Sequence, residues 1–324
     1  MPDPNGRMST PARHHGPVLL TGATGFIGRR IQHVLLQAGM PVRITLRPGS
    51  RHRSHADPRC ELRECNLADV DEFSYAVAGA RAIVYCAGSV RGRSLEDFLP
   101  ANVNGVRTVM QALSSQRAAV PFLLISSLAA SRPGLSDYAR SKYLGEEAVR
   151  EQVHSPWAVL RLPAVYGPGD AEMAPLLKMA RSGFVARPGP KSQRVSLLYA
   201  DDAATAVISW LNNWQKCRGM TYSIDDGYRG GYDWRAIANA AGSKRFYSTA
   251  IPLPLLLGLA RLNLTFSRLV GYAPMFTPGK VRELTQPDWL CDNTDFSRAT
   301  GWRPQTGLPS GIRLSLGLGA AEAN

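Results

Sequence analysis

A tyrosine and a lysine stand four residues apart in the segment Tyr138-Ala139-Arg140-Ser141-Lys142. Residues at this spacing share one face of a helix. A free phenol, with a pKa of about 10, is a weak acid or base at neutral pH, and a neighbouring ammonium favours its ionised form. The pair predicts proton transfer by Tyr138, assisted by Lys142. The same spacing also occurs as an ordinary surface pair, so its place in the chain matters.

Two serines, Ser126 and Ser127, follow the apolar segment Phe122 to Ile125 and precede the tyrosine. A hydroxyl at the end of a strand could hydrogen-bond a substrate carbonyl and stabilise the charge that develops on its oxygen. Serines at strand ends also serve simply as turn formers. Beside the Tyr138 and Lys142 pair, we expect one serine of this region to take part in catalysis.

A glycine-rich turn lies near the start of the chain, in Thr21-Gly22-Ala23-Thr24-Gly25-Phe26-Ile27-Gly28. Apolar residues precede it and helical spacing follows it, which predicts strand, turn and helix. Glycine lets the backbone approach a pyrophosphate, and helix N-terminal amides bind it. A tight turn without a ligand is the alternative. The predicted cofactor contacts here are Gly22, Thr24, Gly25, Phe26, Ile27 and Gly28.

Arg47 follows the second predicted strand, Pro41 to Leu46. An acidic residue at this point accepts hydrogen bonds from the ribose of NAD, whereas an arginine favours the 2′-phosphate of NADP. With Arg51 and Arg53 close behind it, Arg47 favours NADP(H) over NAD(H). The alternative is a solvated basic loop.

The chain alternates between strand and helix patterns up to Pro163, which predicts an α/β fold with a Rossmann-type, doubly wound parallel sheet. Further strands are expected near Leu62 and over Ala82 to Cys86, Phe122 to Ile125 and Ala158 to Leu162; helices are expected around Arg107 to Leu113 and over Tyr138 to Glu151. Later expectations are a helix over Leu176 to Ala180, a strand over Val195 to Tyr199, a helix through Trp210 capped by Asp202, and an apolar helix over Leu253 to Val270.

Three parts of the chain are expected. Residues 1–16 are polar and rich in Pro and Gly, which predicts a disordered extension with no secretory leader. Residues 17–165, joined again by 193–225, form the predicted NADP-binding core. Residues 166–192 and 226–324 form a smaller substrate-binding lobe.

Charge and cysteines restrict the classes of partner. The formal net charge is +13, and the first 60 residues hold nine arginines against two aspartates. This local excess suits a phosphate, and the chain carries no nucleic-acid recognition motif, so no nucleic-acid partner is expected. Five scattered cysteines without a C-x-x-C pair argue against a disulfide framework and a metal site, which favours the cytoplasm. The longest apolar run, Ala250 to Ala260, is too short to cross a bilayer, so no transmembrane helix is predicted.

These features together resemble the extended short-chain dehydrogenase/reductases, also called the NAD-dependent epimerase/dehydratase family. Tyr138 to Lys142 and Ser126-Ser127 match its catalytic motifs. The other matches are Thr21 to Gly28, Cys86-Ala87-Gly88, Asn102-Val103-Asn104-Gly105, Arg161 to Gly169, Tyr199-Ala200-Asp201-Asp202 and Gly301-Trp302-Arg303-Pro304. The resemblance covers residues 18–317.

The resemblance implies roles for single residues. Tyr138 would be the acid or base, Lys142 would bind the nicotinamide ribose, Ser127 would polarise the carbonyl, and Asn102 would support the site. Further cofactor contacts implied are Asn66, Leu67, Cys86, Ala87, Gly88, Pro163 and Val165. Asn66 stands where the family often has an aspartate, which weakens a contact with adenine. The interval from Ser127 to Tyr138 is short, which leaves Ser126 or Ser131 as alternatives.

Within the family, Val42 to Arg47 is similar to the branch with dihydroflavonol 4-reductase and 3β-hydroxysteroid dehydrogenase relatives. This implies interconversion of a ketone and a secondary alcohol on a hydrophobic small molecule, by a monomer or a homodimer. The stretch from Ile251 to Val270 could line an apolar pocket or form ordinary lobe core, and Arg261 and Arg268 could face anionic lipid.

Two other functions stay open at this point. One is a nucleotide-sugar epimerase or dehydratase with tightly bound cofactor, in which Arg194 could contact a diphosphate. The other is a non-catalytic NADP-binding protein, although the intact tyrosine and lysine argue against it.

Overall fold

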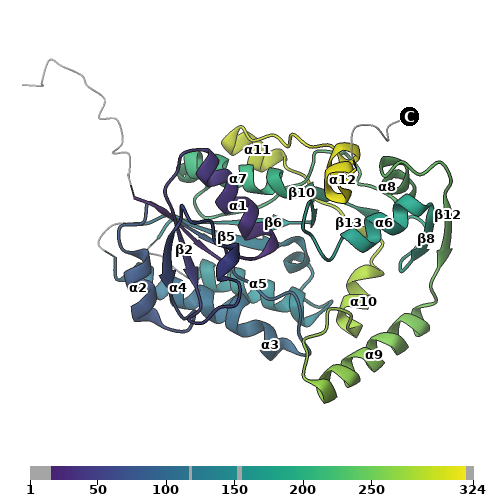
Figure 1. Ribbon diagram of the computed structural model, residues 1–324, viewed down its shortest axis with the longest axis horizontal. Coiled ribbons are helices and arrows are strands. Elements are labelled where there is room, and N and C mark those ends of the chain that lie inside the picture. The colour runs from purple at the N-terminus through teal and green to yellow at the C-terminus, as the bar shows by residue number, and fades with distance from the viewer. Residues whose placement is uncertain (1–15, 117–118, 152–154, 319–324) are drawn as a thin grey trace, which may run out of the picture.

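A computed structural model describes residues 16–116, 119–151 and 155–318. Its central sheet has seven parallel strands in the order β11-β6-β5-β4-β1-β2-β3 (Figure 1). The strands are β1 (Val18–Thr21), β2 (Val42–Leu46), β3 (Glu61–Glu64), β4 (Ala82–Tyr85), β5 (Phe122–Ser127), β6 (Trp157–Leu162) and β11 (Met220–Ser223). This order runs outward in both directions from β1 and β4, as in a doubly wound sheet. The predicted Rossmann-type α/β fold is confirmed. Apart from Gly16, the predicted disordered extension lies outside the described residues.

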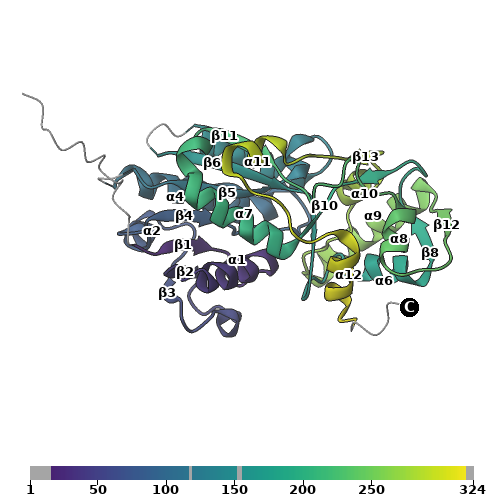
Figure 2. The same cartoon turned by 90° about the horizontal axis from the view of Figure 1, so that it is seen from above.

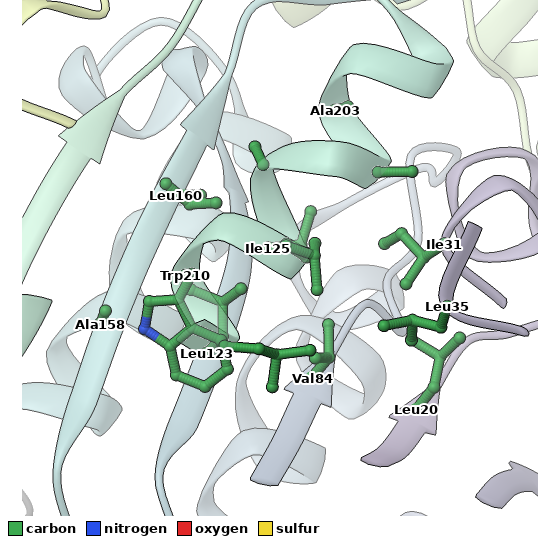
Figure 3. Close-up of a cluster of buried hydrophobic side chains, with 14 of the residues drawn as sticks. Leu20, Ile31, Leu35, Val84, Leu123, Ile125, Ala158, Leu160, Ala203 and Trp210 are labelled. Atoms are coloured by element: carbon green, nitrogen blue, oxygen red, sulfur yellow. The ribbon is translucent and has the colours of Figure 1, made fainter. Parts of the chain in front are cut away.

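Helices cover both faces of the sheet. Helices α1 (Phe26–Gln37) and α7 (Ala200–Asn213) pack on one face, and α2 (Val70–Val77), α4 (Gly105–Ser114) and α5 (Asp137–Arg150) pack on the other. Because both faces are covered, the inner strands are mostly apolar. On the α1 and α7 face, Trp210 lies against a cluster that Figure 3 shows, with Leu20, Ile31, Leu35, Val84, Leu123, Ile125, Ala158, Leu160 and Ala203.

A smaller lobe stands beside the carboxyl ends of the strands (Figure 2). Three pairs of short parallel strands belong to it: β7 (Ala164–Tyr166) with β10 (Leu197–Tyr199), β8 (Phe184–Arg187) with β12 (Tyr247–Ala250), and β9 (Arg194–Val195) with β13 (Asp288–Trp289). Its helices are α6 (Ala174–Ser182), α8 (Trp234–Ala240), α9 (Leu253–Val270), α10 (Pro278–Leu284) and α12 (Leu308–Leu316), and α11 (Thr294–Thr300) packs on α7. The domain limits expected from the sequence stay a prediction.

Two local predictions were wrong for tertiary reasons. Asp202 does not cap α7, which begins at Ala200; its carboxylate accepts the amides of Gln305 and Thr306, both at 2.9 Å. The predicted strand Val195 to Tyr199 is divided at Ser196, whose hydroxyl bonds Asp225 and Cys291. In both cases a polar side chain forms hydrogen bonds with residues that are distant in the sequence. All five cysteines are free thiols, as expected.

Helix α9 extends beyond the apolar run on which the expectation of no transmembrane helix was based. Its 18 residues have a mean hydropathy of 1.3, and by length and composition alone the helix could cross a membrane. The sequence argument had stopped at the apolar run ending at Ala260. Length and composition do not distinguish a helix that spans a membrane from other apolar helices. The contacts of α9 with the rest of the protein are therefore needed to tell the two apart.

Helix α5 approaches its neighbour closely at Gly145. A π-helical turn, Pro100–Asn104, continues the short helix α3 (Leu95–Leu99), and a Cβ at Gly145 would lie 2.2 Å from the carbonyl oxygen of Asn102. Because this oxygen belongs to the backbone and cannot move aside as a flexible side chain would, position 145 does not tolerate a side chain.

We expect Gly145→Ala to lower the free energy of unfolding by about 1–3 kcal/mol, because α5 or the π-helical turn must move. Gly258→Ala is the matched control, since Gly258 is also inside a helix but has nothing within 4 Å of its added Cβ. The control should raise stability by about 0.5–1 kcal/mol. Urea unfolding measures both, and equal changes would contradict the close approach.

Candidate active site

The predicted cofactor residues converge at the carboxyl edge of the sheet, after β1, β2, β3, β4 and β6. In the first turn, Gly22 has φ +66°, and a Cβ there would lie 2.6 Å from the amide nitrogen of Ala87. The Thr21 hydroxyl accepts the amides of Cys86 and Ala87, both at 3.1 Å. The glycine turn and the segment after β4 are therefore held together.

The N-terminus of α1 is open to an anion. Gly25 caps the helix without a side-chain hydrogen bond, and its first turn has no acidic residue. Free amides and the helix dipole at such an end bind phosphate groups. The residues present here thus fit the diphosphate of a dinucleotide.

The basic loop after β2 divides into paired and unpaired arginines. Arg53 pairs with Glu64, and Arg59 pairs with Asp57 at 2.7 Å. Arg47 and Arg51 are exposed and have no ion pair with any described residue. Arg47 is thus available at the end of β2, where the adenosine ribose of a dinucleotide lies in this fold.

The remaining predicted cofactor residues lie along the same edge. Asn66 follows β3, and its side-chain oxygen accepts the amide of Ala68 at 3.1 Å, with the partly buried Leu67 between them. Pro163 directly follows β6, and Val165 is in β7; both are partly buried. Their contacts with a cofactor stay a prediction.

Tyr138 is in the first turn of α5 and faces the end of β5. Its hydroxyl is within hydrogen-bonding reach of the Ser127 hydroxyl, and its ring packs edge-on against Phe98 at 6.0 Å. Burial raises the pKa of Tyr138 to about 12, although the Ser127 hydrogen bond lowers it in part. The phenol therefore keeps its proton at neutral pH.

The two alternative serines are engaged elsewhere. The Ser126 hydroxyl donates to the buried carboxylate of Glu146 at 2.6 Å, and the Ser131 hydroxyl donates to the carbonyl of Leu128 at 2.7 Å. Successive strand residues point to opposite faces, which separates Ser126 from Ser127. Of the three serines, Ser127 is the one beside Tyr138.

Lys142 is buried one turn after Tyr138, and its ammonium donates to the carbonyl of Ile125 at 2.9 Å. Burial lowers the pKa of Lys142, while Cys86 and Glu146 raise it in part. The prediction that Lys142 brings the pKa of Tyr138 toward neutrality is not what the structure shows, because burial of the phenol outweighs its surroundings. The Lys142 ammonium instead lies at the end of β5, where a Cβ added at Gly88 would be 3.8 Å from it.

Asn102 joins the cofactor edge to α5. Its side-chain oxygen accepts the amide of Ser89 at 2.9 Å, and its side-chain nitrogen donates to the Ser89 carbonyl at 3.0 Å and to the Ser141 hydroxyl at 2.8 Å. A Cβ at Gly88 would lie 3.0 Å from the Asn102 side-chain oxygen. The π-helical turn places this amide between the segment after β4 and Ser141 of α5, and such turns are frequent at functional sites.

Three residues near Tyr138 or Lys142 were missed by the sequence argument. Glu146 continues the i, i+4 spacing of Tyr138 and Lys142, which is a signal that was available. Lys280 and Glu283 come from α10: the Lys280 ammonium is 5.9 Å from the centre of the Tyr138 ring and 2.9 Å from the Glu283 carboxylate. The Glu283 charge raises the pKa of Tyr138. No spacing in the sequence joins α10 to this site.

The comparison with known families rests on the same residues. The model of the NAD dependent epimerase/dehydratase family matches residues 18–224, which include the glycine turn, Ser127, Tyr138 and Lys142. The chain belongs to this family. It is an NAD(P)-dependent oxidoreductase of the extended short-chain dehydrogenase/reductase group.

The proteins to which this chain is similar include two reductases and, among solved structures, an epimerase. A ceramide reductase of Caulobacter vibrioides is 33% identical over 92% of this chain and 99% of its own length. A dihydroflavonol 4-reductase of Hordeum vulgare is 30% identical over 30% of both chains. Among solved structures, a UDP-glucose 4-epimerase of Thermotoga maritima has a TM-score of 0.69 at 17% identity, covering 93% of this chain and 98% of its own. At that identity the likeness concerns the fold.

We expect Ser127→Ala to raise the pKa of Tyr138, because the phenolate loses a hydrogen-bond donor. Ser131→Ala is the matched control and should leave this pKa unchanged. Glu283→Gln should lower it, because the carboxylate repels the phenolate. Carbon NMR of the tyrosine Cζ, assigned with Tyr138→Phe, follows the titration. A larger shift in the Ser131 variant than in the Ser127 variant would refute the pairing.

Proposed function

We propose that this family member is an NADPH-dependent reductase that converts the ketone form of a ceramide-like lipid into its secondary alcohol. The observation that carries the proposal is the protonated Tyr138 hydroxyl beside Ser127. A protonated phenol is the form that can give a proton to the oxygen of a carbonyl during its reduction.

The lipid class is supported by the resemblance to the Caulobacter vibrioides ceramide reductase over almost the whole of both chains. A ceramide has one secondary alcohol in its long-chain base, next to the carbon that carries the amide. The corresponding ketone is the group that a site of this kind can reduce.

The described residues divide the work as follows. The Tyr138 hydroxyl donates its proton to the carbonyl oxygen of the substrate. The Ser127 hydroxyl donates a hydrogen bond to the same oxygen and stabilises its developing charge. The Lys142 ammonium, held at the strand end by the Ile125 carbonyl, would bind the nicotinamide ribose. The cofactor, when bound, supplies the hydride.

The preference for NADPH is supported by Arg47 and Arg51, which are exposed at the end of β2 with no ion pair to any described residue. A 2′-phosphate would provide the anion that these guanidinium groups lack.

The test of the substrate is NADPH consumption by the purified chain with a 3-oxo-ceramide in detergent micelles, with mass spectrometry of the product. We expect loss of NADPH and gain of two hydrogens in the lipid. Interconversion of nucleotide sugars without NADPH consumption, by protein that retains cofactor through gel filtration, would support the epimerase alternative instead.

Tyr138→Phe should lower kcat by about 10²–10⁴-fold in this assay, because the proton donor is lost. NADPH binding should be nearly unchanged, because the ring still packs against Phe98. Tyr143→Phe, one position after Lys142 on the same helix, should retain full activity. Normal turnover in the Tyr138 variant would refute the mechanism.

Arg47→Ala should weaken binding of NADPH by about 10–100-fold and of NADH much less, since it removes a charge-assisted hydrogen bond to the phosphate. Arg59→Ala is the matched control, because Arg59 is already paired with Asp57. Fluorescence titration with both nucleotides measures the change. Equal losses for NADPH and NADH would count against the phosphate contact.

A further inference from the structure

Helix α9 carries an apolar stripe that the rest of the described chain does not cover. The stripe consists of residues spaced four and three apart, which share one face of the helix. Its members are 48–81% exposed, with Leu269 the most open: Leu255, Leu259, Leu262, Phe266 and Leu269. Large side chains at this exposure and spacing mark an interaction surface rather than scattered surface residues.

A different side of α9 is anchored to the lobe. Leu256 and Ala260 pack with Val281 of α10, and the Asn263 side chain donates to the carbonyl of Phe276 at 2.8 Å. Figure 1 shows α9 at the periphery of the lobe, with α10 on its inner side. The helix is therefore held against protein on one side while its apolar stripe faces outward.

The charge of α9 points to the chemistry of the partner. The helix contains no acidic residue, and its two basic residues, Arg261 and Arg268, are exposed with no ion pair to any described residue. Seven residues apart, they share a third side of the helix, distinct from both the stripe and the side that packs on the lobe. Apolar side chains flanked by unpaired arginines complement a surface that is apolar inside and anionic at its edge.

We propose that the α9 stripe inserts into the interface of a bilayer that contains anionic lipids, with Arg261 and Arg268 at the level of the head groups. The helix lies in the interface and does not cross the bilayer, because its contacts with α10 and Phe276 hold it to the lobe. This docking rests on α9 alone and not on the proposed substrate.

A second copy of the chain fits this surface less well. Two α9 helices packed through their stripes would bring four arginines together, and neither helix has a carboxylate to pair with them. Like charges without partners oppose association in such an interface. Self-association is therefore the alternative outcome of the test.

Helix α9 is connected to the proposed proton donor through α10. In the segment between α9 and α10, the Pro274 carbonyl accepts a hydrogen bond from the amide of Gly92 at 3.2 Å. Helix α10 places the Lys280 ammonium over the Tyr138 ring. Docking through the stripe would therefore bring the lobe that carries Lys280 to the bilayer that holds a lipid ketone. This consequence, unlike the docking, rests on the proposed function.

Vesicle flotation tests the docking. The probes are vesicles of phosphatidylcholine alone and of phosphatidylcholine with phosphatidylglycerol. We expect the protein to float with the anionic vesicles, and the Leu262→Glu, Phe266→Glu double variant to lose more than about tenfold in binding. The matched control is Tyr75→Glu on α2, an apolar side chain that is 81% exposed, which should bind as the unchanged protein does. Arg261→Gln with Arg268→Gln should weaken binding only to the anionic vesicles.

Three results would overturn the docking. One is equal flotation of the double variant and the unchanged protein. Another is failure of the unchanged protein to float, together with a dimer that the double variant converts to monomer in light scattering. The third is resistance to extraction by alkaline carbonate, which would indicate a spanning helix. NADPH binding by the double variant verifies its fold, and flotation without turnover of any lipid ketone would refute the proposed function alone.

Discussion

The buried carboxylate of Glu146 fixes helix α5 to the sheet. It accepts hydrogen bonds from Ser126 on β5 and from Arg161 on β6. It also pairs with Arg150, whose guanidinium group donates a hydrogen bond to Thr221 on β11. A buried carboxylate without water is stable only when such partners surround it. Helix α5 therefore has one favourable rotation about its axis and one favourable position along the sheet. Tyr138 and Lys142 share a face with Glu146, and the position of the proton donor at the end of β5 follows from this contact.

The second constraint is the closeness of the backbone on the other side of α5. Gly145 lies against the Asn102 carbonyl, and Gly105 lies so near Tyr85 that a Cβ would be 2.3 Å from its hydroxyl. These contacts set the π-helical turn, whose Asn102 amide then bonds both the segment after β4 and Ser141. Since Thr21 holds the same segment to the glycine turn, the cofactor edge and the proton donor belong to one rigid unit.

The sequence predicted what depends on local pattern. The glycine turn, the strand ends and the spacing of Tyr138 and Lys142 are short-range features, and parallel strands bring their ends to one edge whatever lies between them. Lys280 and Glu283 could not be found in this way, because they reach Tyr138 from more than 130 residues away through the packing of the lobe. Asp202 and Ser196 were misread because their polar groups serve distant segments. Apolar spacing predicted α9 itself, but the same spacing is typical of a buried face, and only packing shows that its stripe is open.

The lobe also takes part in setting the acidity of the site. Burial raises the pKa of Tyr138, Ser127 lowers it, and Glu283 raises it from α10. The Glu283 carboxylate is held by Ser136, at the cap of α5, and by Lys280. Because α9 packs on α10, the apolar stripe and the charge beside the proton donor are parts of one packed unit. Contact of that unit with the core therefore favours the protonated phenol, which is the form that reduction of a carbonyl requires.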